Sequence, residues 1–162
     1  MTPDSSPPPV GRTCFREPIP EIARCAQLLD DAVSAHLADN RSVATALIRQ
    51  ANMTVVRDWC ESLWGKKSGY VHYGHVPDAP AFLPDHGRST NRMPTAETKN
   101  RLIERDGHHC RFCGIPVIRR EVRERIRRTY PEAKLWGRTN AEQHAAFQTM
   151  WLQFDHLVDC ND

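Results

Sequence analysis

The chain has 162 residues, of which 40% are hydrophobic, so it can form one modest core and a good deal of polar loop. Its 22 basic and 20 acidic residues leave a net charge of only +2, which excludes a uniformly polycationic protein. No apolar run approaches the roughly 20 residues of a membrane-spanning helix, and the N-terminus lacks the apolar segment of a signal peptide. We therefore expect a cytoplasmic protein without a membrane partner.

The N-terminal part of the chain divides into a tail and a helical segment. Residues 1–17 are rich in proline and serine and predict a disordered tail. Residues 18–65 carry apolar residues at intervals of three and four, which predicts a helical hairpin with helices over 20–38 and 42–65. The first helix should bury a stripe made of Ile22, Ala26, Leu29, Val33 and Leu37. The side chains of Cys25, Cys60, Trp59 and Trp64 are typical of an ordinary core.

The middle and C-terminal parts alternate between irregular and periodic segments. Residues 66–94 are dominated by Gly, Pro, His and Asp and predict an irregular connector. Thr95 can cap a helix over 96–105, with Gly107 as its stop, and an arginine-rich helix should follow over 119–129. We expect a last helix from residue 140, followed by an alternating strand over 152–158. The buried face of that helix should consist of Ala145, Phe147, Met150 and Trp151.

A pair of cysteines, Cys110 and Cys113, follows the capped helix at the spacing of a metal knuckle. In a tight turn, two thiolates at this spacing can bind one zinc ion. A structural zinc needs four ligands, and the neighbouring His108 and His109 could contribute to them. A redox pair and a packed pair of thiols are the alternatives. The redox interpretation is disfavoured because no βαβ unit surrounds the pair.

Basic residues concentrate beside the cysteine pair. Nine arginines and only four acidic residues occur between residues 101 and 128. Such a block next to a candidate site suits a polyanionic ligand. The candidates for phosphate contacts are Arg111, Arg119, Arg120 and Arg123. The alternative interpretation is a solvated helix face on which arginine and glutamate side chains pair.

These motifs together resemble a known family. The segment RLIERDGHHCRFCG at 101–114, followed later by QFDHLV at 153–158, resembles bacterial HNH endonucleases of the zinc-knuckle type. The helices around residues 28–33 and 61–66 also resemble the N-terminal part of bacterial HNH proteins. The resemblance implies an α+β fold, in which the helical hairpin precedes a ββα-metal unit with a Cys knuckle. The family continues with a Gly-rich turn and an Asn-bearing helix, so we expect residues 95–162 to be an incomplete, C-terminally truncated HNH nuclease domain.

The resemblance also implies a chemistry, the hydrolysis of phosphodiester bonds in DNA with a divalent metal. His156 would act as general base, a role suited to an imidazole with an ordinary pKa of ~6.5. Asp155 would bind Mg²⁺ or another divalent cation. Cys110 and Cys113 would supply half of a structural zinc site, and the four arginines would give salt-sensitive contacts to phosphates.

Two other functions stay open at this point. One is a non-catalytic nucleic-acid-binding remnant that uses the arginine-rich block. The other is an interaction protein built on the N-terminal helices. An Asn-bearing helix after His156 is the sequence feature that would distinguish the nuclease from both.

Overall fold

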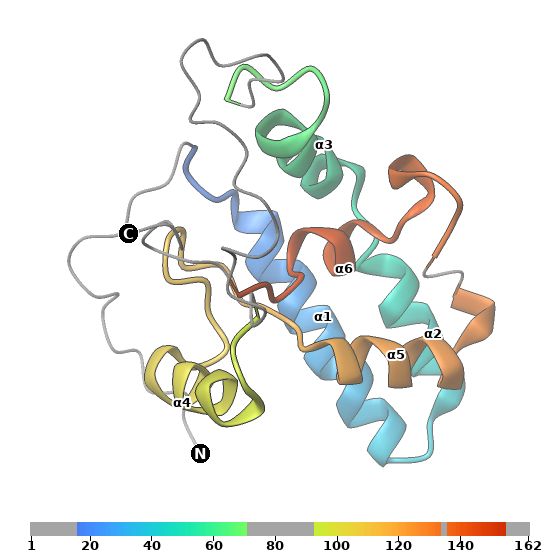
Figure 1. Cartoon of the computed structure of the whole chain (residues 1–162). Coiled ribbons are helices and arrows are strands. Elements are labelled where there is room, and N and C mark those ends of the chain that lie inside the picture. Colours follow the sequence, from blue (N-terminus) through green and yellow to red (C-terminus); the bar gives the residue numbers. More distant parts are fainter. Residues whose placement is uncertain (1–15, 71–92, 134–135, 155–162) are drawn as a thin grey trace, which may run out of the picture.

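The computed structural model describes residues 16–70, 93–133 and 136–154, which fold as helices joined by loops (Figure 1). The elements in chain order are α1 (Pro20–Leu37), α2 (Arg41–Gln50), α3 (Thr54–Trp64), α4 (Ala96–Asp106), α5 (Arg120–Thr129), the 3₁₀ turns η2 (Pro131–Ala133) and η3 (Asn140–Glu142), and α6 (Ala145–Thr149).

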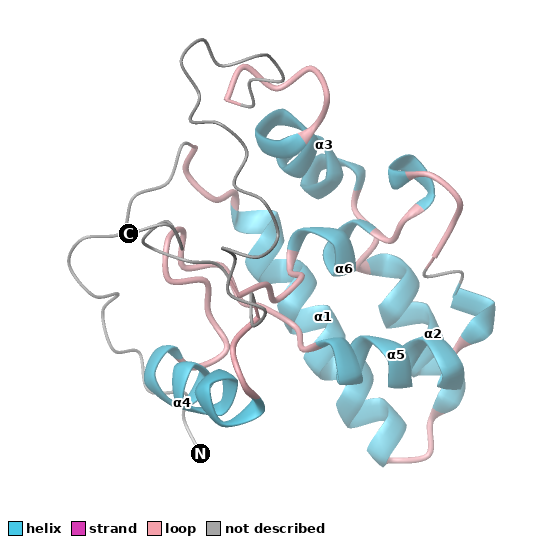
Figure 2. Cartoon of the chain, viewed as in Figure 1, coloured by secondary structure: helices cyan, strands magenta, loops and turns pink. Residues whose placement is uncertain are grey.

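The predicted α+β fold with a ββα-metal unit is wrong for this part of the chain. The described residues contain no β-strand (Figure 2), only isolated bridges that join His109 to Pro116 and Ile118 to Trp151. Residues 152–154, where the predicted strand should begin, are loop, and the rest of that strand lies outside the described residues. The pairing stays short because Pro116 has no N–H to donate to a ladder.

The second predicted helix is two helices, α2 and α3, separated at residues 51–53. The Oδ1 atom of Asn52 accepts hydrogen bonds from the N–H of Ala145 at 2.8 Å and from Arg57 at 3.1 Å. The carbonyl of Ala51 accepts a hydrogen bond from the thiol of Cys25 at 3.1 Å. These long-range partners satisfy backbone groups that a helix end leaves unpaired, so the chain can turn here.

The core lies between α1, α2, α3 and α6, with α6 seated beside α1 and α3 (Figure 1). In and just after α6, the side chains of Ala145, Ala146, Phe147 and Met150 have no exposed surface. Residues from the two ends of the described chain therefore close one apolar core. Trp151, predicted to share this buried face, is instead 48% exposed.

The buried stripe of α1 is rotated from the predicted one. Ile22 and Leu29 are buried as predicted, whereas Val33 and Leu37 are exposed. The other buried residues of this helix are Cys25, Leu28 and Ala32. The packing of α1 against α2, α3 and α6 selects this face, and sequence periodicity cannot identify those neighbours in advance. On α3, Trp59 is buried as predicted, but Trp64 is 62% exposed.

Helix α4 stands to one side of this bundle (Figure 1). It begins as predicted, because the hydroxyl of Thr95 accepts a hydrogen bond from the N–H of Thr98, and it ends at Gly107, whose φ is +65°. Glycine tolerates this left-handed conformation without strain. No residue of α4 is buried, so its position depends on few apolar contacts.

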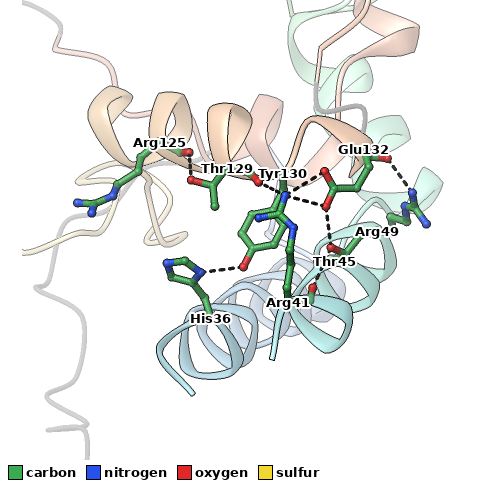
Figure 3. Close-up of polar contacts among 8 residues, drawn as sticks. All are labelled: His36, Arg41, Thr45, Arg49, Arg125, Thr129, Tyr130 and Glu132. Atoms are coloured by element: carbon green, nitrogen blue, oxygen red, sulfur yellow. Dashed lines mark hydrogen bonds and ion pairs between the residues drawn. The ribbon is translucent and has the colours of Figure 1, made fainter. Parts of the chain in front are cut away.

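A polar cluster fixes the C-terminal end of α5 to α1 and α2 (Figure 3). At its centre is Tyr130, which is 3% exposed and whose hydroxyl lies 2.9 Å from Nδ1 of His36. The guanidinium of Arg41 lies 4.7 Å from the centroid of the tyrosine ring and pairs with Glu132 at 3.1 Å. Arg49 donates to the carbonyl of Glu132 at 2.7 Å. The helix that carries Arg120 and Arg123, two of the four predicted phosphate contacts, is thus anchored at its C-terminal end.

Candidate metal knuckle and nucleic-acid interface

Cys110 and Cys113 lie in a tight turn directly after α4, as the sequence predicts. The N–H of Cys110 donates to the carbonyl of Ile115, and the N–H of Gly114 donates to the carbonyl of Cys110, both at 2.8 Å. Gly114 has a φ of +76°, a conformation that favours glycine. A further bond of 2.8 Å joins the N–H of Val117 to the carbonyl of His108 and closes the loop around the knuckle.

The knuckle stabilises a thiolate. The pKa of Cys110 is lowered to about 5, first by a hydrogen bond from the thiol of Cys113 and then, against an opposing effect of burial, by the backbone N–H groups of Cys113, Phe112 and Gly114. The core thiols behave in the opposite way, because burial raises the pKa of Cys25 and of Cys60. The thiolate is the form of cysteine that binds metals, so Cys110 is chemically distinct from the core cysteines.

The two knuckle cysteines fit half of a zinc site. In a tight turn their sulfur atoms supply two of the four ligands that a structural zinc needs. Among the described residues, no group of three or more His, Cys, Asp or Glu side chains is close enough together to hold a metal. The structure thus does not gather His108 and His109 with the cysteines into such a group. None of the four described cysteines is part of a disulfide.

The chain leaving the knuckle runs beside the segment that precedes the predicted catalytic pair. The N–H of Ile118 donates to the carbonyl of Met150 at 2.7 Å, and the N–H of Leu152 donates to the carbonyl of Ile118 at 3.3 Å. Asp155 and His156 lie outside the described residues. The structure therefore places the chain that leaves the knuckle beside residues 150–152, a few positions before the pair in the sequence.

A cleft of about 900 Å³ opens between α4, α5 and the residues around α6. Its charged lining combines a majority of cations with two acids: Lys99, Arg119, Arg120, Arg123, Arg127, Glu121 and Glu124. Its aromatic lining consists of Trp136, Trp151 and Phe154. Cationic and aromatic side chains in one concave surface are the combination with which proteins bind nucleotides.

Arg123 is the most unusual residue of this cleft, because it is only 2% exposed. Its guanidinium lies 3.9 Å from the ring centroid of Trp151 and 5.8 Å from that of Trp136. Its Nε atom is buried without a hydrogen-bond partner. Burial lowers the pKa of this guanidinium, and the faces of the two indole rings offset part of the cost of burying its charge.

Three of the four arginines predicted to contact phosphates, Arg119, Arg120 and Arg123, line this cleft. Arg111 does not line it; this side chain lies on the knuckle, 3.6 Å from the carboxylate of Asp106. Arg119 also pairs with Glu121 at 3.3 Å. The block thus contains paired arginines on the surface, as the alternative interpretation expects, and one buried arginine in the cleft.

The cleft is also lined by residues that were not predicted from the sequence: Lys99, Arg127, Trp136 and Phe154. Arg127 follows Arg119 and Arg123 at intervals of four along α5, so helical spacing alone could have placed it on the same face. The aromatic residues are remote from this helix in sequence. Their concentration after the arginine block was the available signal, although Trp151 was assigned to the core.

Comparison of the chain with family models, with curated proteins and with solved structures gave no match. Within the residues described by the structure, no helix combines the length and the apolar character needed to cross a membrane. Function therefore has to be argued from the knuckle, the cleft and the motif that follows them.

Proposed function

We propose that this chain is an HNH-type endonuclease that hydrolyses phosphodiester bonds of DNA with a divalent metal. The observation that carries the proposal is the pairing of Ile118, which leaves the knuckle, with Met150 and Leu152, which lead toward Asp155 and His156. A metal-stabilised turn would support the segment that bears the catalytic pair. This support depends on hydrogen bonds of the described residues and does not require the predicted strand.

Each part of the site has a role in this proposal. His156 removes a proton from the attacking water, and Asp155 binds the divalent cation. When bound, that cation neutralises charge on the scissile phosphate and on the leaving oxygen. Cys110 and Cys113 supply two ligands to a structural zinc, and the cleft arginines hold neighbouring phosphates. We also propose the cytoplasm as the compartment, because it keeps thiols reduced and available to zinc.

A second candidate function is nucleic-acid binding without cleavage. The buried Arg123 and the cationic lining of the cleft favour it, because these features need no contribution from residues 155–162. Binding of this kind would be steeply dependent on salt and tolerant of sequence. It would also proceed without a divalent metal.

Nicking of supercoiled plasmid DNA by the full chain tests the nuclease proposal. With Mg²⁺ we expect nicking that EDTA abolishes and that His156→Ala slows by at least about 100-fold, the usual contribution of a general base. Arg24→Ala, on the exposed surface of α1 and outside the cleft, is the control and should nick like the wild type. Equal nicking by His156→Ala would overturn the role of His156. Metal-independent binding without any nicking would instead favour the second candidate.

A further inference from the structure

The cleft contains a buried cation, Arg123, which forms no direct ion pair with another residue that the structure describes. Within the described part of the chain, the nearest acids on α5 pair with other arginines, Glu121 with Arg119 and Glu124 with Arg127. Arg123 has no such ion pair, and its Nε has no hydrogen-bond partner. Glu124, Glu121 and the two indole rings compensate the buried charge of Arg123 only in part, so this wall of the cleft favours an anion.

Aromatic rings lie next to the cations of the cleft. Trp151 is 48% exposed, and its ring centroid lies 6.4 Å from that of Trp136. The ammonium of Lys99 lies 5.6 Å from the ring centroid of Phe154. Bases of a single strand can stack on exposed rings while cations hold the phosphates between them, whereas bases within a duplex are already stacked on one another.

We propose that this cleft binds a single-stranded stretch of DNA, with a base stacked on Trp151, phosphates on Arg119 and Arg120, and the buried Arg123 adding positive potential behind them. This inference rests on the proposed function, because it specifies single-stranded DNA as the form that the same site binds. The volume of about 900 Å³ lies within the range of sites for small ligands, roughly 300–1,000 Å³, and suits a few nucleotides better than a duplex.

Fluorescence anisotropy tests this inference with a labelled oligo-deoxynucleotide, offered to the full chain as a single strand and as a blunt duplex. The buffer contains no added Mg²⁺, which prevents cleavage without stripping a zinc ion from the knuckle. We expect the single strand to bind at least about ten-fold more tightly than the duplex. Duplex binding that is equal or tighter would overturn the inference, as would polyphosphate that competes as well as unlabelled single strand.

Substitutions assign the binding to the cleft. Trp151→Ala should weaken single-strand binding by about ten-fold, and Trp151→Phe should retain most of it, because a phenyl ring still stacks. Trp64→Ala is the matched control, since this tryptophan is 62% exposed on α3 and away from the cleft. Unchanged binding by Trp151→Ala would contradict the inference.

A second pair of variants keeps the test valid if Trp151→Ala fails to fold. Arg120 is exposed on the cleft, so Arg120→Gln should fold and should reduce the slope of log K against log salt by about 0.7, the value for one phosphate of a single strand. Arg24→Gln, on the exposed surface of α1, should leave the slope unchanged. Equal slopes for the two variants would contradict the inference.

The proposals on binding and on cleavage can be refuted independently of each other. Single-strand binding by a chain that cuts no DNA would support this inference and contradict the nuclease proposal. Cleavage that depends on His156, combined with tighter binding of duplex, would support the nuclease and overturn the inference.

Discussion

The helical core and the arginine cleft use opposite kinds of side chain. The core around α6 is closed by apolar residues without exposed surface, such as Phe147 and Met150, and its one buried histidine, His144, packs against the ring of Phe147. In the cleft, α4 buries nothing and α5 buries only the charged Arg123. Apolar burial, and with it stability, is therefore concentrated in the core, whereas the cleft presents charged and aromatic side chains such as Arg120 and Trp151 to a ligand.

The largest effect should come from removing the centre of the core. Phe147 has no exposed surface, so Phe147→Ala should reduce the free energy of unfolding by about 3–5 kcal/mol, measured by urea denaturation. Phe112→Ala is the control, because Phe112 lies on the knuckle and is 44% exposed, and it should cost less than about 1 kcal/mol. Similar losses for the two variants would contradict the conclusion that the core contributes more to stability than the knuckle.

The next effect is a pH dependence that originates in the core. Burial lowers the pKa of His144 to about 4 from its ordinary value of 6.5, and its Nε2 donates to the carbonyl of Ile48 at 2.7 Å. Between these two pH values the unfolded chain binds a proton and the folded chain does not. Stability should therefore be complete above about pH 6.5 and fall by up to about 3 kcal/mol as the pH drops to about 4.

Urea denaturation across this pH range isolates the contribution of His144. His144→Gln should be less stable than the wild type near neutral pH but should lose less stability on acidification, because the titrating group is gone. The same acid loss in both proteins would show that other groups cause it and would contradict the assignment to His144.

A smaller effect should come from the junction between the two regions. Tyr130→Phe removes the hydroxyl that lies 2.9 Å from His36 but keeps the buried ring, so we expect a loss of about 1 kcal/mol in the free energy of unfolding. Ser34→Ala, which removes an exposed hydroxyl of α1, is the control and should change stability by less than about 0.5 kcal/mol. Equal free energies of unfolding for the two variants would mean that the polar cluster around Tyr130 does not stabilise the packing of α5 against α1 and α2.

The smallest effect on stability should come from the knuckle. Cys110→Ser should change the unfolding free energy of the metal-free chain by less than about 1 kcal/mol. The same variant should lose the zinc binding that we expect of the wild type. In the wild type near neutral pH, iodoacetamide should alkylate Cys110 before Cys25 and Cys60, and zinc should protect it. Mass spectrometry of the alkylated chain reads out both results. Faster modification of the core thiols would contradict the lowered pKa of Cys110.

Local signals predicted several elements well. The cap at Thr95, the stop at Gly107 and the knuckle turn at Cys110 all appear where the sequence places them. These features depend on residues within a few positions of one another, so a pattern in the sequence contains all the information they need.

Features that depend on distant residues were not predictable. At the break between α2 and α3, Asn52 accepts a hydrogen bond from the N–H of Ala145, 93 residues away in the sequence. The burial of Arg123 likewise requires Trp136 and Trp151 from beyond α5. The α+β expectation failed because it came from the family resemblance and from an alternating pattern, and neither shows whether a strand finds a partner.

The proposal that this chain is a nuclease with His156 as general base is best tested by its rate of cleavage of a single-stranded DNA in Mg²⁺. We expect cleavage by the wild type and a rate at least about 100-fold lower for His156→Ala. Equal rates in the two proteins, or binding of the strand by the wild type without cleavage, would contradict it.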